Sequence, residues 1–194
     1  CGRAVRPRAR ERGQLDLCQQ HGRALATAVE AGLLPAAKPI RGKLSRGMET
    51  VTLEFAPPPD KATLETRTAS KNIYEAAHAR RMLALLEKDG KINTTYPYLI
   101  QAIRLGDEVT VITLAGEVVV DYSLRLKREL TGSATWVAGY SNDVFGYVPS
   151  RRVLEEGGYE AGGAMLYTSF PGPFAPDVEE RIITGVHGLV KRLK

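Results

Sequence analysis

The chain has 194 residues, of which 43% are hydrophobic and 25% are charged, and its formal net charge is +5. This length and apolar content predict one globular domain, or a large piece of one, with a hydrophobic core. No stretch approaches the ~18 uninterrupted apolar residues of a membrane span, so we expect no transmembrane segment. No signal peptide is visible, because arginines stand where its apolar run would lie.

The positive charge is concentrated at the start of the chain. Residues 1–12 hold five arginines and one glutamate, a net of +4, which leaves +1 for the remainder. A short basic run binds phosphates in some proteins, but no aromatic stacking platform accompanies it or the later cluster at Arg80 and Arg81. We expect residues 1–13 to be a basic, disordered or aberrant N-terminus, and we expect no nucleic acid as a partner. Nucleic-acid binding through this run stays as an alternative.

The first elements follow from apolar spacing. Residues 14–31 have helical periodicity, and Gly32 is a stop signal. Residues 33–47 contain two prolines and two glycines, which predict a connection. Residues 48–55 alternate polar and apolar side chains, as in a strand with one buried face.

The middle of the chain predicts helices followed by a hairpin. Asp60 is the expected N-cap of a helical stretch that breaks near Ser70 and ends at Gly90. Residues 95–104 and 107–114 are predicted strands joined by a tight turn.

The second of these strands ends at Glu117, and a helix is expected directly after it. The apolar residues of that helix recur every four positions, at Val118, Tyr122, Leu126 and Leu130. Ligands bind at such strand ends in open α/β sheets, which makes Glu117 a candidate site residue. The alternative is a simple capping acid that is stabilised by the helix dipole.

The last third predicts one strand, a long irregular segment and a final helix. Residues 135–138 read as the strand, and the final helix starts near Asp177. Residues 139–175 are rich in Gly, Tyr and Pro, and their aromatic side chains favour an ordered segment. The fold class is therefore α/β (mixed α and β), a sheet with flanking helices.

The residues alone give no metal-site signature. His21, His78 and His187 are far apart, and neither HxH nor HExxH occurs. The two cysteines form no CxxC, and no GxSxG or P-loop is present. Tyr147 and Tyr159 flank residues 148–158. From the residues alone, both are explained as ordinary tyrosines at the edge of a core.

Three segments carry a family resemblance. LAGEVVVDYSLRLKREL (114–130) resembles a segment of the neutral/alkaline ceramidases in which a Glu after a small residue leads into a helix. WVAGYSNDVFGYVPSRRVLEEGGYE (136–160) resembles the family's Gly-x-x-Asn-x-x-x-x-Tyr stretch and its second Tyr-Glu. AGGAMLYTSFPGPFAPDVEERI (161–182) is a weaker match. The resemblance covers residues 14–192, with its specific motifs in 114–167, and is greatest to bacterial ceramidase-like proteins.

The resemblance implies a zinc-dependent amidohydrolase that cleaves the N-acyl amide bond of ceramide. In that family two His, one Glu and one Tyr hold a single Zn²⁺. The matching positions are Glu117 and Tyr147 as metal ligands, and Tyr159 as the catalytic tyrosine that polarises the substrate carbonyl. Carboxylate oxygen is an ordinary zinc ligand, and a nearby Zn²⁺ lowers the pKa of a phenol.

The family's zinc histidines and serine motif have no counterpart in the matched residues. We therefore expect residues 14–194 to be the C-terminal portion of a larger ceramidase-type catalytic domain, a fragment that is inactive alone and whose missing N-terminal half is a possible partner. Our hypothesis for the start at Cys1 and its arginines is a truncated or frameshifted reading frame. Full-length relatives are expected to be secreted or periplasmic. The competing interpretation is a non-catalytic remnant that binds a partner.

The resemblance leaves the substrate open. Ceramide needs an apolar channel. The four side chains considered for its lining, which ordinary core packing explains as well, are Val144, Phe145, Phe170 and Phe174. A small soluble N-acyl compound fits the same residues.

Overall fold

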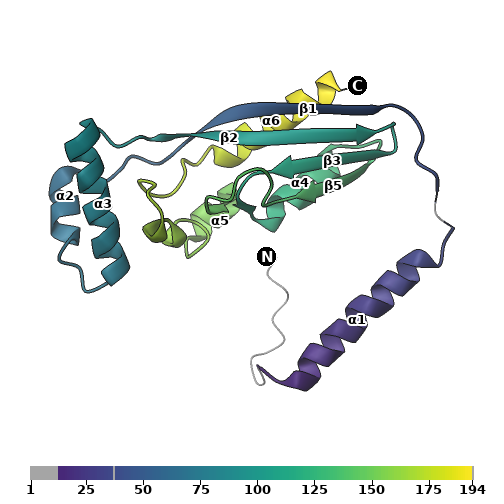
Figure 1. Cartoon of the computed structure of the whole chain (residues 1–194), viewed down its shortest axis with the longest axis horizontal. Coiled ribbons are helices and arrows are strands. Elements are labelled where there is room, and N and C mark those ends of the chain that lie inside the picture. The colour runs from purple at the N-terminus through teal and green to yellow at the C-terminus, as the bar shows by residue number, and fades with distance from the viewer. Residues whose placement is uncertain (1–12, 37, 194) are drawn as a thin grey trace. The chain divides into compact units, whose positions relative to one another are not determined.

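Figure 1 shows the computed structural model of the chain, which describes residues 13–36 and 38–193. The chain divides into two units, Cys1–Ile40 and Arg41–Lys194. In the first unit, helix α1 (Leu15–Leu33) has the predicted position, and none of its residues is buried. The arginine-rich start, residues 1–12, lies outside the described residues.

The second unit is a mixed α/β structure, which confirms the predicted fold class. Its elements are β1 (Leu44–Glu54), α2 (Lys61–Arg67), α3 (Ile73–Asp89), β2 (Thr95–Leu105), β3 (Val109–Leu114), β4 (Glu117–Val118), α4 (Val120–Glu129), β5 (Ala134–Ala138), β6 (Tyr147–Val148), α5 (Arg151–Glu156), η1 (Gly163–Tyr167) and α6 (Val178–Arg192).

The main sheet has the strand order β1-β2-β3-β5. The pairs β1–β2 and β2–β3 are antiparallel, whereas β3 and β5 are parallel. A parallel pair needs a crossover connection, and α4 is part of it. Because β3 and β5 run in the same direction, the segments that follow them, residues 115–119 and 139–146, leave the sheet from the same edge.

Helix α6 covers one face of this sheet by packing on β1 and β2. Two glycines permit the close approach. A Cβ at Gly185 would lie 2.7 Å from Val51 Cγ2, and one at Gly47 would lie 2.8 Å from Leu189 Cδ1. The apolar side chains of α6 are buried here, at Val178, Ile182, Val186 and Leu189.

The opposite face of the sheet is accessible and carries both apolar and polar side chains. We call it the open sheet face. On β3, Ile112 is fully buried on the covered side, while its neighbour Val111 is only partly buried on the other. Trp136 and Met48 have exposed fractions of 69% and 61%, too high for core positions. The apolar residues of the open sheet face are Met48, Leu99, Ile103, Val111 and Trp136, and the same register places Arg46, Thr50, Gln101 and Thr113 on it.

Helices α2 and α3 form a hairpin with a small core of their own, made by Leu64, Ala79, Met82 and Ile92. Asp60 caps α2 as predicted, by accepting from the Thr63 N–H at 2.7 Å, and the predicted break near Ser70 separates the two helices. His78 on α3 contacts the Phe170 carbonyl through Nε2 at 2.7 Å, which ties the hairpin to the segment before α6.

Two predicted boundaries are wrong. Residues 44–47 were expected in a connection, but β1 begins at Leu44 because β2 is long enough to pair with it and Gly47 leaves room for α6. Val118 was expected on a helix, but it lies in β4, and α4 begins at Val120. Within the described residues, no helix is long and apolar enough to cross a membrane.

Candidate functional site

The two-stranded sheet β4–β6 brings two of the predicted site residues together. The strands are parallel, and Glu117 is the register partner of Tyr147. The Glu117 N–H donates to the Gly146 carbonyl at 2.8 Å, and the Val119 N–H donates to the Val148 carbonyl at 3.2 Å. This short ladder therefore places a carboxylate residue and a phenol residue side by side at the edge where β3 and β5 end.

A tight backbone turn delivers Glu117 to this position. Gly116 has a φ of +68°, and a Cβ there would lie 2.9 Å from the Gly146 carbonyl oxygen. Its N–H donates to the Asp143 carbonyl at 2.7 Å, and its carbonyl accepts from the Tyr140 N–H at 2.8 Å. The loop after β5 thus wraps around the turn after β3, and only glycine fits at the contact.

The same loop contains two strained residues. Tyr140 and Asn142 have φ values of +54° and +70°, which side chains other than glycine rarely adopt. Such conformations cost of order 1–3 kcal/mol each and are found mainly at functional sites. The Asn142 conformation agrees with the turn chemistry expected from the sequence.

Glu117 interacts with two phenols. A hydrogen bond to Glu117, and then burial, raise the pKa of Tyr140 to about 12. Burial, followed by a hydrogen bond to Glu117 and its negative charge, also raises the pKa of Tyr147. Burial and the Glu117 carboxylate thus both favour the protonated form of the two phenols.

Tyr159 joins the site through Tyr147. The two rings make an edge-to-face contact with centroids 5.5 Å apart. The rings of Tyr159 and Tyr167 have centroids 6.2 Å apart, and the rings of Tyr167 and of Tyr74 on α3 have centroids 4.8 Å apart. We call Tyr147, Tyr159, Tyr167 and Tyr74 the tyrosine row. About half of the surface of Tyr159, Tyr167 and Tyr74 is exposed, so the row forms an accessible aromatic strip that begins at the Glu117 site.

The structure corrects the capping interpretation of Glu117. The N-cap of α4 is Val119, no side chain caps this helix, and the acidic residue of its first turn is Asp121. The residues alone did not point to Tyr140 as a partner of Glu117. The left-handed conformation of Tyr140 cannot be recognised from the sequence. The one signal available was the position of Tyr140 in the Gly-Tyr-Ser-Asn stretch.

Three of the four side chains considered for an apolar channel are packed in the interior. Phe145 and Phe170 have ring centroids 5.8 Å apart, and Phe174 lies 6.2 Å from Phe145 and 4.6 Å from Phe55. They belong to the main core. Val144 is 62% exposed. Ordinary packing therefore explains the three phenylalanines.

The two histidines of the second unit, His78 and His187, do not complete a zinc site at Glu117. His78 contacts the Phe170 carbonyl, His187 contacts Glu129 at 2.8 Å, and His21 is exposed on α1. No group of three or more His, Cys, Asp or Glu side chains suited to a metal occurs in residues 13–36 and 38–193. The described residues thus supply one carboxylate and one phenol, which fit half of the donor set implied by the resemblance and do not form a complete site.

Comparisons of the chain with protein-family models, curated proteins and solved structures return no match.

Proposed function

We propose that Glu117 and Tyr147 contribute half of the metal site of a zinc-dependent amidohydrolase of ceramidase type. The reaction is hydrolysis of the N-acyl amide bond of ceramide or a related N-acyl compound. The observation that carries the proposal is the register pairing of Glu117 with Tyr147 in β4–β6, because two ligands of one ion must lie side by side. The fragment is inactive alone, since the two histidine donors come from outside its described residues.

The chain's own residues have distinct tasks in this proposal. Zinc, when bound, would supply an activated water and polarise the amide carbonyl. Tyr147 must lose its phenolic proton to become a ligand, although Glu117 raises its pKa in the metal-free chain. Tyr159, which is in ring contact with Tyr147, would donate a hydrogen bond to the developing oxyanion.

The tyrosine row supports an N-acyl substrate with an apolar part. It extends from Tyr147 over three partly exposed rings, each with an apolar surface and a polar hydroxyl. Such rings bind amphipathic groups well, because the apolar part of the ligand packs on the ring while its polar part stays hydrated near the hydroxyl. The acyl chain would lie along this row while its amide approaches Glu117.

A zinc titration that supplies the missing nitrogen donors tests the proposal. Zn²⁺ is added to the purified chain in the presence and absence of excess imidazole, and tyrosinate formation is followed by ultraviolet difference absorption. We expect imidazole to strengthen zinc binding, and we expect Tyr147→Phe to abolish the tyrosinate signal. Glu117→Gln should weaken zinc binding without a loss of folding.

Two controls make the titration specific. Tyr159→Phe should leave the tyrosinate signal intact, because Tyr159 is not a ligand in this proposal. His187→Gln removes the ring that contacts Glu129 and should not alter zinc binding. Equal zinc affinity in the wild-type chain, Glu117→Gln and Tyr147→Phe would contradict the proposal.

The open sheet face favours a second candidate function, a non-catalytic module that binds a partner. A sheet face with Trp136 and Met48 exposed is typical of an interaction surface. The occupant that fits is an apolar layer of the polypeptide that supplies the two histidines. Co-expression with that polypeptide should protect the open sheet face from hydrogen exchange, and Trp136→Ser should weaken the complex. Protection without hydrolysis of an N-acyl substrate would favour the binding function.

A further inference from the structure

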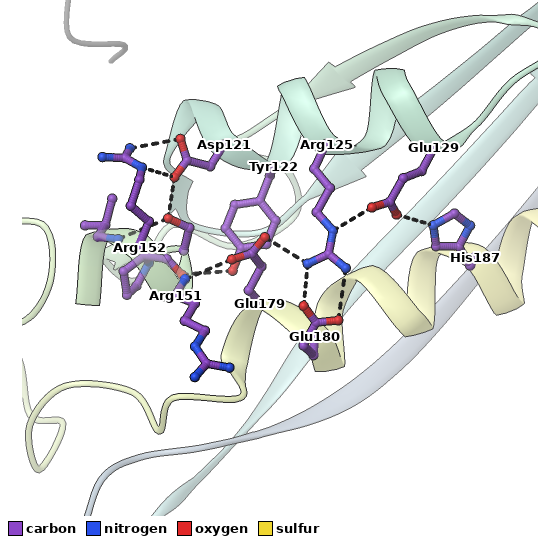
Figure 2. A network of polar contacts seen from close by, with 12 residues as sticks. Asp121, Tyr122, Arg125, Glu129, Arg151, Arg152, Glu179, Glu180 and His187 are labelled. Atoms are coloured by element: carbon purple, nitrogen blue, oxygen red, sulfur yellow. Dashed lines mark hydrogen bonds and ion pairs between the residues drawn. The ribbon is translucent and has the colours of Figure 1, made fainter. Parts of the chain in front are cut away.

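Three polar side chains join the helices that follow the two site strands. Helix α4 begins two residues after β4, and α5 begins three residues after β6. In the first turn of α4, the Asp121 carboxylate accepts a hydrogen bond from the Ser150 hydroxyl. It also accepts from Arg152 Nε and Nη2, each at 3.0 Å (Figure 2). We call Asp121, Ser150 and Arg152 the polar clamp.

Ser150 is buried and has two partners. It is 1% exposed, it donates to Asp121, and its oxygen accepts from the Val153 N–H at 3.2 Å, so it also caps α5. Next to it, the fully buried Tyr122 donates to the Pro149 carbonyl at 2.9 Å. The first turn of α4 therefore holds the chain directly after β6 through both a side chain and the backbone.

The clamp is charged and anchored. Burial acts to raise the pKa of Asp121, but hydrogen bonds from Arg152 and Ser150 outweigh it and lower the pKa overall. Glu179 on α6 accepts from the Arg151 N–H and from Arg125 Nη1, each at 2.9 Å. In Figure 2 the bonds of Glu179 join α6 to Arg125, in the middle of α4, and to the first residue of α5, next to the clamp residues Ser150 and Arg152.

The strands themselves are too short to define their own register. β4 and β6 each have two residues, and so small a ladder is at best marginally stable without tertiary support. A slip of one residue would turn the side chain of Glu117 or Tyr147 to the other face. Something outside the ladder must fix the register, and the clamp joins the two chains within a few residues of both strands.

We propose that Asp121, together with Ser150 and Arg152, is a positioning residue that holds Glu117 opposite Tyr147. Its importance for catalysis rests on the proposed function, whereas the positioning itself is a property of the metal-free chain. The clamp acts on Glu117 and Tyr147 indirectly. It sets the distance between α4 and α5, the helices that follow β4 and β6, and thereby the distance between the two strands.

Amide hydrogen exchange measured by NMR on the metal-free chain tests this proposal. The Glu117 and Val119 amides form the ladder and report its opening directly. In Asp121→Ala and Ser150→Ala we expect these two amides to exchange about tenfold faster, because a lost hydrogen bond to a charged group costs at least that factor. The Ile100 amide in β2 should exchange at the wild-type rate. Ring-to-ring contacts between Tyr147 and Tyr159 should weaken at the same time.

Matched variants separate positioning from general stability. Ser150→Thr keeps a hydroxyl for the cap and for Asp121, and it should restore wild-type exchange. Arg151→Ala removes an exposed pair with Glu155 that stays within α5, so it should leave the ladder unchanged. Equal acceleration of Ile100, Glu117 and Val119 would show a global loss of stability and overturn the proposal, as would wild-type ladder exchange in Asp121→Ala.

The outcome is independent of the zinc titration. Faster ladder exchange in Asp121→Ala, together with failure of the wild-type chain to bind zinc with imidazole, would support the clamp and contradict the zinc function. Zinc binding through Glu117 and Tyr147 with unchanged exchange in Asp121→Ala would support the zinc function and overturn the clamp.

Discussion

Glu117 lies directly opposite Tyr147 in the ladder of β4 and β6, and this relationship contributes to the raised pKa of the Tyr147 phenol. In the metal-free chain the carboxylate favours the protonated phenol. A cation at the same place would favour the phenolate. The direction in which the pKa of Tyr147 moves is therefore a direct report on what occupies the site.

Glu117→Gln should lower the pKa of Tyr140 from about 12 towards the ordinary value of 10.0, because the variant removes the charge that favours the protonated phenol. The pKa of Tyr147 should fall as well. NMR of tyrosines labelled at the ring carbon that carries the hydroxyl measures each phenol separately. Asp143→Asn is the matched control, since Asp143 accepts from Tyr96 and should change the titration of Tyr96 alone. An unchanged pKa for Tyr140 in Glu117→Gln would show that the Glu117 carboxylate does not interact with the Tyr140 phenol.

Gly116→Ala should destabilise the chain more than Gly90→Ala. Both glycines have a φ of +68°, so both variants carry the left-handed penalty of roughly 1–2 kcal/mol. Only at Gly116 would the new Cβ also meet neighbours, at 2.9 Å from the Gly146 oxygen and from Val148 Cγ2. Urea unfolding measures the difference, which we expect to exceed about 1 kcal/mol. Equal losses would mean that the loop after β5 shifts freely.

The fold was largely predictable because its signals are local. The hairpin of β2 and β3, the Asp60 cap, and the four-residue spacing of Tyr122 and Leu126 each depend on a few neighbouring residues, and the structure confirms them. The extent of β1 was missed because it depends on how far β2 continues and on the approach of α6 to Gly47. Neither is encoded near residue 44.

The candidate site was predictable only in part. The resemblance singled out Glu117, Tyr147 and Tyr159, and the structure brings them together, while their roles stay a prediction. The interaction of Glu117 with Tyr140 and the clamp at Asp121 depend on residues that are distant in sequence and on a left-handed backbone. No periodicity or short motif indicates such contacts. They depend on the parallel pairing of β3 and β5, which brings the ends of both strands to the same edge.

The two faces of β3 should respond differently to truncation. Ile112→Ala removes a fully buried side chain on the covered face of the sheet and should cost about 2–5 kcal/mol of unfolding free energy. Val111→Ala lies on the open sheet face and should cost clearly less, because solvent already reaches the side chain. Urea unfolding at low protein concentration measures both. A Val111→Ala loss as large as that of Ile112→Ala would show that the open sheet face is covered in the isolated chain.

The last prediction concerns acid sensitivity. Burial lowers the pKa of His78 below its ordinary value of 6.5, opposed by the hydrogen bond with Phe170, and the charges of Arg81 and Arg67 lower it further. The unfolded chain therefore takes up a proton more readily than the folded chain. His78 stabilises the fold fully above pH 6.5, and this contribution is lost as the pH falls through its lowered pKa.

Urea unfolding at about pH 7 and about pH 5 should show a loss of stability in the wild-type chain that is smaller in His78→Gln, which keeps a donor for the Phe170 carbonyl. His21→Gln, on the exposed helix α1, is the control and should keep the wild-type pH dependence. The chemical reason is specific to His78, since protonation there places a second charge beside Arg81 in a buried setting. The same pH dependence in His78→Gln and the wild-type chain would assign the acid sensitivity to groups other than His78.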